Sequence, residues 1–213
     1  MRYERHSQIF NSDELRYYPC TVIGAGAIGS NLAQQLARIG VPSITVYDFD
    51  NVEEVNLGAQ GYGENSLGKN KAEVTAVICR NINSNIYLYP SRKWDAYSAL
   101  DTVVFSCVDS METRKTIFEC CKKKDRVLID GRMSSEIARV ICAWDKESYD
   151  YYETTLYSDE EAVQESCTTR STCYCSNIAA GLMLAQFSKI LRKFDHIDRD
   201  IIFSIAGMEL SRK

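Results

Sequence analysis

The sequence contains no long hydrophobic run. Nowhere in its 213 residues does an apolar stretch approach the roughly 20 residues that a helix needs to cross a bilayer, and the first residues, M-R-Y-E-R-H, lack the apolar core of a signal peptide. We therefore expect a cytoplasmic protein with no membrane partner. Internal repeats and low-complexity tracts are also missing, which excludes a repeat protein and a long linker.

An excess of positive charge is missing as well. The formal net charge of −4 argues against nucleic acid as a partner, although it leaves room for a local basic pocket around phosphates. Prolines are few, at three, and 45% hydrophobic with 25% charged residues describe an ordinary globular chain. The nine cysteines lie mostly inside apolar runs, where free thiols pack as small hydrophobic groups, so a disulfide scaffold is not expected.

What the sequence does contain is a nucleotide-binding pattern in its first quarter. The apolar run C-T-V-I leads into Gly24-x-Gly26-x-x-Gly29, a helical pattern follows, and a second apolar run ends in D-F-D at 48–50. Glycines let the backbone approach phosphate oxygens, and the start of a helix offers free N–H groups and the positive end of its dipole. The pattern is typical of a strand, turn, helix and strand that bind a nucleotide.

Strands and helices continue to alternate after this unit. Runs rich in β-branched residues indicate strands buried on both faces, and the helices between them provide crossover connections. The expected fold class is therefore α/β, with a Rossmann-like, doubly wound, mostly parallel sheet. We predict a short helix at 13–18, then helices at 70–82 and 110–124, and strands at 86–89, 101–108 and 126–130, the last turning at Gly131.

The alternation stops near residue 136. A strand at 137–144 follows without an intervening helix, so we expect an antiparallel extension at the C-terminal end of the sheet. The prediction for the remainder is an irregular crossover loop at 145–175, a helix at 178–192 capped by Ser176 and Asn177, and a last strand at 201–205.

The length favours one domain over two. We expect a single domain at 1–213, divided into an N-terminal arm (1–19), a nucleotide-binding half (20–135) and a part with the crossover loop, late helix and last strands (136–213).

Asp48 ends the second predicted strand, where a carboxylate can accept hydrogen bonds from both ribose hydroxyls. NAD and ATP fit this position equally well. The following stretch, 51–68, is rich in Gly and Asn and is long for a loop in a compact domain, so we expect it to have a function.

Several spaced motifs decide between these nucleotides. The stretch D-F-D-N-V-E-E-V-N-L-G-A-Q at 48–60, followed by G-K-N-K at 68–71, resembles the D-x-D-x-V-x-x-x-N-L-x-R-Q … G-x-x-K signature of the ThiF/MoeB-type adenylyltransferases, relatives of the ubiquitin-activating enzymes. R-Y-E-R-H at 2–6 resembles their R-Y-x-R-Q arm, and C-V-D-S at 107–110 with Arg114 resembles their C-x-D-N … R element. The motifs follow the family's order and spacing over most of residues 2–135.

This resemblance implies a reaction and a set of binding residues. ATP and the C-terminal carboxylate of a small ubiquitin-like or sulfur-carrier protein would form an acyl-adenylate and release pyrophosphate. Because the carboxylate is itself the nucleophile, the enzyme must suppress charge repulsion and align the reactants. The implied nucleotide contacts are Gly24, Gly26, Gly29, Asp48, Asp50, Asn56, Gln60 and Lys71.

The resemblance also implies catalytic roles for three side chains. Lys71 would contact phosphates, Asp109 would hold Mg²⁺ on the phosphate oxygens, and Arg5 would reach the γ-phosphate of a partner subunit's ATP, which makes a homodimer the expected state. Each has a structural alternative: Lys71 as a solvated lysine, Asp109 as a helix cap, and Arg5 on an unordered arm.

The sequence departs from the family pattern at Ala59, where the signature has arginine. One phosphate-facing cation is missing, and we expect Arg114, Arg132 or Lys69 to replace it. Zinc is not expected, because the family site uses two C-x-x-C pairs and this chain has only C-x-C at 173–175 and the adjacent pair at 120–121.

A cysteine in the crossover loop takes the activated acyl group in many members of this family. Cys167 and Cys173 lie in the corresponding region, and Arg170 could lower a thiol pKa there. We select Cys167 as the acceptor, because Cys173 is close to the apolar helix and is expected to be buried; packing remains an alternative role for both.

Two other functions stay open at this point. An inactive scaffold subunit would explain Ala59, and an NAD-dependent oxidoreductase would explain the glycine turn and Asp48 but not the stretch from Asn56 to Lys71. The chain lacks the length for the added catalytic-cysteine and ubiquitin-fold domains of large ubiquitin-activating enzymes, so a minimal adenylation domain is expected.

Overall fold

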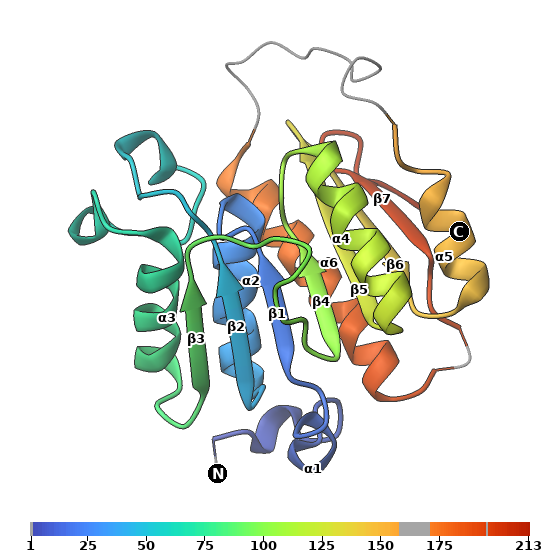
Figure 1. Ribbon diagram of the computed structural model, residues 1–213, viewed down its shortest axis with the longest axis horizontal. Coiled ribbons are helices and arrows are strands. Elements are labelled where there is room, and N and C mark those ends of the chain that lie inside the picture. The colour runs from blue at the N-terminus through green and yellow to red at the C-terminus, as the bar shows by residue number, and fades with distance from the viewer. Residues whose placement is uncertain (1, 158–170, 195) are drawn as a thin grey trace.

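The computed structural model describes residues 2–157, 171–194 and 196–213. In these residues eight strands form one sheet in the order β3-β2-β1-β4-β5-β6-β7-β8, flanked by helices (Figure 1). The strands are β1 (Cys20–Ile23), β2 (Ser43–Tyr47), β3 (Tyr87–Ser91), β4 (Val103–Ser106), β5 (Val127–Ser134), β6 (Ile137–Ala143), β7 (Asp200–Ser204) and β8 (Glu209–Arg212).

The sheet has a parallel part and an antiparallel part. Strands β1 to β5 are parallel, whereas β6, β7 and β8 each run antiparallel to the preceding strand. This arrangement confirms the predicted fold class. The chain order reverses between β1 and β4, and ligands of open α/β sheets bind outside the carboxyl ends of the strands at such a point.

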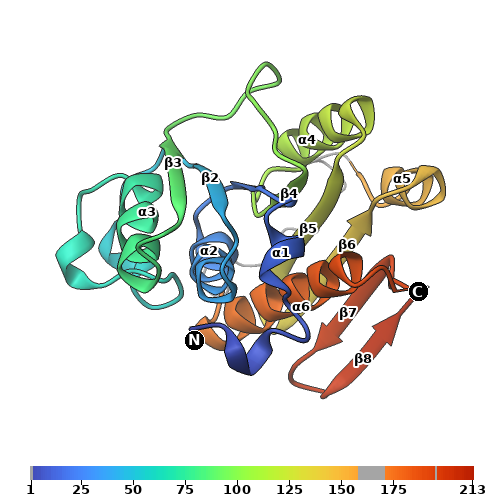
Figure 2. The same cartoon turned by 90° about the horizontal axis from the view of Figure 1, so that it is seen from below.

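Helices cover both faces of the sheet (Figure 2). One face carries α2 (Ala27–Ile39), α3 (Lys71–Ile82) and α6 (Cys173–Leu191), and the other carries α4 (Met111–Lys124) and α5 (Lys146–Glu153). Successive strand residues alternate between the two cores, as Val22 and Ile23 do, because side chains of a strand point to opposite faces. Within the described ranges no helix is long and apolar enough to span a bilayer.

Some predicted boundaries are wrong in the middle of the chain. β5 does not turn at Gly131 but continues to Ser134, because the absent side chain makes room for α6: a Cβ at Gly131 would lie 2.5 Å from Met183 Sδ. β3 runs through Pro90, which an edge strand tolerates because its free side needs no N–H donor.

The prediction of an irregular loop over 145–175 is wrong at both of its ends. At the first end the chain forms α5: Asp145 caps this helix by accepting a hydrogen bond from Ser148 N over 2.8 Å. One face of α5 buries Tyr149 and Tyr152. Helix α6 begins five residues earlier than predicted, with Thr172 as its N-cap. The strand predicted to be the last one, β7, is followed by a further strand, β8, which forms a hairpin with it.

The N-terminal arm contains a 3-10 turn, η1 (Glu4–His6), and the short helix α1 (Ser12–Leu15), which ends before the predicted residue 18. Phe10 and Leu15 anchor the arm in the core shared by α2, α3 and α6. The arm lies at the amino ends of the parallel strands, at the bottom of Figure 1.

Candidate nucleotide-binding site

The glycine turn between β1 and α2 is closely packed on two of its three glycines. Gly24 has φ of +89°, in the left-handed region, and a Cβ there would lie 2.6 Å from the carbonyl oxygen of Cys107. A Cβ at Gly29 would lie 1.9 Å from the Gly24 oxygen. Gly26, the N-cap of α2, has no atom within 4 Å of its Cβ position. Gly24 and Gly29 are thus needed for packing, whereas Gly26 faces open space through which a ligand can approach.

Asp48 lies beside this turn at the carboxyl end of β2. Its carboxylate accepts hydrogen bonds from Ala25 N over 2.6 Å and from Asp50 N over 2.9 Å. Burial raises the pKa of Asp48 above the usual range, and the two amide donors and the Lys71 charge oppose this shift. Each carboxylate oxygen keeps a free lone pair, so the group can still accept hydrogen bonds from a ribose.

Lys71 is a buried cation at the start of α3. Its side chain is 8% exposed, and Nζ lies 3.1 Å from Asp50 Oδ2. The preceding residue, Asn70, caps α3 and donates its amide hydrogens to the carbonyl oxygens of Asp48 and Asp50, each over 3.0 Å. The alternative of a solvated surface lysine is therefore wrong. Through Asn70 and Lys71, the start of α3 thus holds the Lys71 ammonium group close to the segment that carries the Asp48 and Asp50 carboxylates.

The stretch 51–68 closes over the first turn of α2. Tyr62 donates its hydroxyl hydrogen to Ala25 O over 2.6 Å, and Gly61 N donates to Ser30 Oγ over 2.9 Å. Two 3-10 turns, η2 (Glu54–Asn56) and η3 (Glu64–Ser66), give the stretch its local structure. The stretch is thus an ordered loop held against the glycine turn, and its function stays a prediction.

Asn56 and Gln60 lie within this closed loop. Asn56 Oδ1 accepts from Glu53 N over 2.9 Å in a reciprocal capping box, which leaves the amide nitrogen as the group that could donate to a phosphate. Gln60 Oε1 is a buried oxygen with no hydrogen-bond partner in the described part of the chain. Buried polar atoms of this kind are rare, and a bound ligand or water is a common explanation.

Ala59 lies against the first turn of α6, where Ser176 Oγ donates to the Ala59 carbonyl oxygen over 3.0 Å. The structure separates the three proposed substitutes for the missing arginine. Lys69 is exposed and donates to Asn65 O over 2.8 Å. Of the three candidate cations, Lys69 alone is exposed.

Arg114 and Arg132 are both committed to internal contacts. They flank the fully buried Asp130: Arg114 donates to its carboxylate and to Val108 O, and Arg132 Nε donates over 2.7 Å. Arg132 also donates to the carbonyl and hydroxyl oxygens of Thr155, over 2.9 and 3.1 Å. Burial alone would raise the pKa of Asp130, but the two guanidinium groups hold it below the usual range. Both guanidinium groups are thus engaged in contacts inside the protein.

Asp109 lies in the loop between β4 and α4, two residues beyond the Cys107 carbonyl that contacts Gly24. The helix cap is Ser110, whose side chain accepts from Thr113 N over 3.2 Å. Asp109 is exposed and has no hydrogen-bond or ion-pair partner among the residues that the structure describes. The capping alternative for Asp109 is therefore wrong, and its carboxylate is available to a ligand.

Arg5 lies far from the other candidate residues of its own chain. The arm packs on the last turn of α2, where a Cβ at Gly40 would lie 2.7 Å from the Tyr3 ring. Gly26 is at the other end of this 13-residue helix, about 20 Å away at 1.5 Å per residue. Arg5 is therefore not brought to the candidate site of its own chain.

The candidate acceptor Cys167 lies outside the described residues. Cys173 is the first residue of α6 and is exposed, so the expectation of a buried Cys173 is wrong. Across the described ranges no group of three or more His, Cys, Asp or Glu side chains could hold a metal ion. Mg²⁺ does not need such a group, since one or two carboxylates together with phosphates and water suffice.

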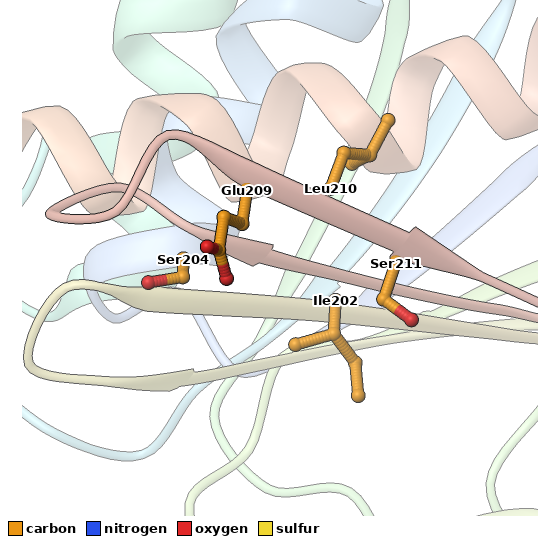
Figure 3. A pocket seen from close by; sticks show the side chains of 5 residues that line it. All are labelled: Ile202, Ser204, Glu209, Leu210 and Ser211. Carbon is orange, nitrogen blue, oxygen red and sulfur yellow. The ribbon is translucent and has the colours of Figure 1, made fainter.

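A separate hollow of about 430 Å³ lies on the hairpin of β7 and β8 (Figure 3). Its lining residues belong to the antiparallel end of the sheet and include none of the predicted site residues: Ile202, Ser204, Glu209, Leu210 and Ser211.

Sequence reasoning missed Tyr62, Asn70 and Asp130 as residues that organise the site. Asn70 carries a local signal, because asparagine before a helical pattern is a common N-cap. Tyr62 and Asp130 act through contacts with residues 37 and 16 positions away, and no local pattern marks such contacts.

Fold and site together define an α/β protein of Rossmann-like topology with a buried lysine near a glycine turn. The model of the ThiF family matches residues 6–210, and the chain belongs to this family. The resemblance of the sequence motifs is thereby confirmed.

Relatives of known name match parts of the chain. Ubiquitin-like modifier-activating enzyme 5 of Bombyx mori is 26% identical over 151 residues, which cover 63% of this chain and 38% of that protein. Adenylyltransferase and sulfurtransferase MOCS3-1 of Zea mays is 36% identical over 118 residues, covering 52% of this chain and 25% of that protein. The chain thus matches only 38% and 25% of the length of these two relatives.

Solved structures share the fold over the whole chain. E. coli MccB with succinimide has a TM-score of 0.81 at 19% identity and is covered over 71% of its length, and E. coli MccB with ATP has a TM-score of 0.77 at 19% identity and is covered over 70%.

Proposed function

We propose that this chain uses ATP and Mg²⁺ to adenylylate the C-terminal carboxylate of a small ubiquitin-like or sulfur-carrier protein, with release of pyrophosphate. The observation that carries the proposal is the Lys71 ammonium, buried beside Asp50 at the edge where Gly26 opens the turn to a ligand. Among the residues that the structure describes, Lys71 Nζ has one hydrogen-bond partner, Asp50, and its remaining hydrogens could be donated to a polyphosphate.

The described side chains fit ATP and Mg²⁺. The open Cβ position of Gly26 and the start of α2 suit phosphate oxygens, and Asp48 suits the ribose hydroxyls. Lys71, the Asn56 amide and the buried Gln60 supply polar groups around them, with Asp50 setting the position of Lys71. Asp109 supplies an exposed carboxylate for Mg²⁺, which shields the phosphate charge from an approaching anion when bound.

The chemistry asked of the chain is alignment and charge control. The carrier carboxylate attacks the α-phosphorus, the bond to the bridging oxygen breaks, and pyrophosphate leaves with the bonding electrons. No proton is removed, so no general base is required. Lys71 lowers the repulsion between two anions, and loss of such a group costs on the order of 10²- to 10³-fold in rate.

A homodimer completes this assignment, with residues 1–213 acting as one adenylation domain. Arg5 lies on the arm at the end of α2 remote from Gly26, so it would act on the γ-phosphate bound by the partner. In a two-fold symmetric dimer each arm reaches the other site.

The names of the relatives support the substrate class. The Bombyx mori relative is a ubiquitin-like modifier-activating enzyme, and the Zea mays relative is an adenylyltransferase and sulfurtransferase. MccB has been solved in complex with N-formylated MccA, so a peptide terminus is a further candidate substrate of the same chemistry.

We assign the acyl acceptor, where the reaction proceeds to a thioester, to Cys167. Exposed Cys173 at the start of α6 is the competing thiol. A covalent carrier adduct formed by Cys167→Ala and lost in Cys173→Ala would transfer the role to Cys173.

A catalytically inactive scaffold is the second candidate function. It is favoured by Ala59 together with the internal engagement of Arg114 and Arg132, which leaves the phosphate region one cation short. An NAD-dependent oxidoreductase is disfavoured, because the loop that brings Asn56 and Lys71 to the turn would serve no nicotinamide chemistry.

ATP–pyrophosphate exchange separates these functions. The protein is incubated with Mg-ATP, labelled pyrophosphate and candidate carriers that end in Gly-Gly, with Asp109→Ala as the inactive control and Glu119→Ala, at an exposed acidic position of α4, as a surface control. Carrier-dependent exchange lost only in Asp109→Ala supports adenylylation. ATP binding without exchange for any carrier supports the scaffold, and binding of NAD in place of ATP contradicts both.

A further inference from the structure

Asp130 is a fully buried carboxylate that the proposed chemistry does not use. It lies on β5 opposite Ser106, the last residue of β4, and therefore directly below the loop that carries Asp109. Arg114, Arg132 and the hydroxyl of Tyr152, at 3.0 Å, donate hydrogen bonds to it. The two arginines and Asp130 form a buried triad, named here the Asp130 triad, with one net positive charge.

One arm of the triad reaches the candidate magnesium ligand. Arg114 lies in the first turn of α4 and is 5% exposed. Its guanidinium group joins the Asp130 carboxylate to Val108 O and also lies 3.3 Å from Gly131 O. Val108 immediately precedes Asp109. The guanidinium group of Arg114 therefore restrains the backbone that carries the exposed Asp109 side chain.

The other arm reaches the end of α5. Arg132 holds both the carbonyl and hydroxyl oxygens of Thr155, while Tyr152, on the last turn of the same helix, donates to Asp130. The Tyr152 ring is stacked on Phe118 of α4 at 5.1 Å between centroids. The triad therefore cannot shift without moving α4, β5 and the end of α5 together.

We propose that the Asp130 triad is a positioning device that holds Asp109 in place for Mg²⁺ and so sets the Mg²⁺ dependence of ATP binding. This inference rests on the proposed function. Arg114 is a positioning residue in this assignment, because it acts through the Val108 backbone and not on the nucleotide. Groups that orient a metal ligand typically change metal affinity by about 10- to 100-fold when they are altered.

The chain contains a matched control for this network. Asp200 accepts hydrogen bonds from Arg139 over 3.0 and 2.7 Å and from the hydroxyl of Tyr151 over 2.6 Å. This second arginine, aspartate and tyrosine cluster joins β6, β7 and α5 and has no contact with the β4–α4 loop in the described residues. Arg139 lies directly opposite Arg132 in the β5–β6 register, so the control variants keep the positive charge of Arg139 and report what a changed ion-pair geometry does to stability.

The test measures ATP affinity by calorimetry in Mg²⁺ and in EDTA for Arg114→Lys and Tyr152→Phe, with Arg139→Lys and Tyr151→Phe as the matched controls. Lysine keeps the charge beside Asp130 but cannot reach Val108 O at the same time. We expect Arg114→Lys to reduce the gain from Mg²⁺ about tenfold or more while ATP binding in EDTA stays near wild type. Tyr152→Phe should give a smaller loss of the same kind, and the controls should lower the melting temperature without changing the gain.

A double variant tests whether Arg114 acts through Asp109. If it does, Asp109→Ala combined with Arg114→Lys loses no more of the Mg²⁺ gain than Asp109→Ala alone. Additive losses, or equal losses in Arg114→Lys and Arg139→Lys, would overturn the positioning role and leave the proposed function intact. A wild-type protein that binds no ATP with or without Mg²⁺ would overturn the proposed function, and the inference with it.

Discussion

The hydroxyl of Tyr62 donates a hydrogen bond to the carbonyl oxygen of Ala25 over 2.6 Å, and this bond ties the stretch 51–68 to the glycine turn. The same hydroxyl lies 3.0 Å from Thr75 Oγ1 on α3. Burial raises the pKa of Tyr62 far above the usual range, so the hydroxyl keeps its proton and its role as a donor.

Tyr62→Phe should therefore destabilise the protein by about 1–3 kcal/mol, because it leaves the buried Ala25 oxygen without a donor. ATP should also bind more weakly, because the loop that carries Asn56 is less firmly held. Urea unfolding and calorimetry measure the two effects. Tyr97→Phe is the control, since Tyr97 is 97% exposed, and an equal loss in both variants would contradict the assignment.

Gly24→Ala and Gly26→Ala should separate packing from ligand binding. A Cβ at Gly24 meets Cys107 O at 2.6 Å in a left-handed backbone, so this variant should be unstable or fail to fold. A Cβ at Gly26 meets no atom within 4 Å, so this variant should fold and lose only the small stability difference between glycine and alanine at the N-cap of α2. Its ATP affinity should fall about tenfold or more, equivalent to about 1.4 kcal/mol, because the methyl group occupies the approach to the turn.

Mixing two inactive variants tests the exchanged arm. Arg5→Ala impairs the arm and Lys71→Ala impairs the site, so each homodimer should be inactive. Subunit exchange makes hybrid dimers in which one site has both a native arm and a native Lys71, and about a quarter of all sites regain activity at equal mixing. Pyrophosphate exchange before and after mixing measures this gain. Light scattering verifies that dimers are present. If mixing the two variants then restores no pyrophosphate exchange, the proposed role of Arg5 is contradicted.

The acid stability of the protein should depend on Asp200. Burial alone would raise the pKa of Asp200, but hydrogen bonds from Arg139 and Tyr151 lower it below the usual range. A lowered pKa in the folded state stabilises the protein above the unfolded pKa of about 4, and this contribution is lost as the pH falls through the lowered folded value. Asp200→Asn should therefore be less stable than wild type at pH 7, and the difference in melting temperature should shrink below about pH 4. A difference that stays constant down to pH 2 would contradict this.

The sequence allowed the parallel half of the fold to be predicted because its signals are local. The glycine turn, the runs of strands 101–108 and 126–130 and the helix beginning after Asn70 each show within about a dozen residues. The antiparallel end was less predictable. The buried face of helix α5 consists of tyrosines within a polar segment, so the segment shows no clear apolar periodicity. Strand β8 is exposed along its length and therefore has no buried apolar run that would mark it.

The candidate site was predictable to the same extent. Gly24, Gly26, Asp48, Asp50 and Lys71 lie near strand ends and come together at one edge, as their spacing indicated. The Asp130 triad could not be predicted, because its members lie on α4 and β5 and meet only after the sheet has formed. Arg114 and Arg132 consequently looked like free cations in the sequence, whereas the fold neutralises one of the two charges.

The packing of Tyr3 on Gly40 has a consequence for the proposed enzyme in dilute solution. Because the arm packs at the end of α2 remote from Gly26, a lone chain would lack the arm cation that the proposed homodimer supplies. In that proposed dimer, catalytic activity would depend on protein concentration. Specific activity would decline upon dilution below the dissociation constant of the dimer, while the fold and the affinity of each chain for the ribose end of ATP would stay unchanged.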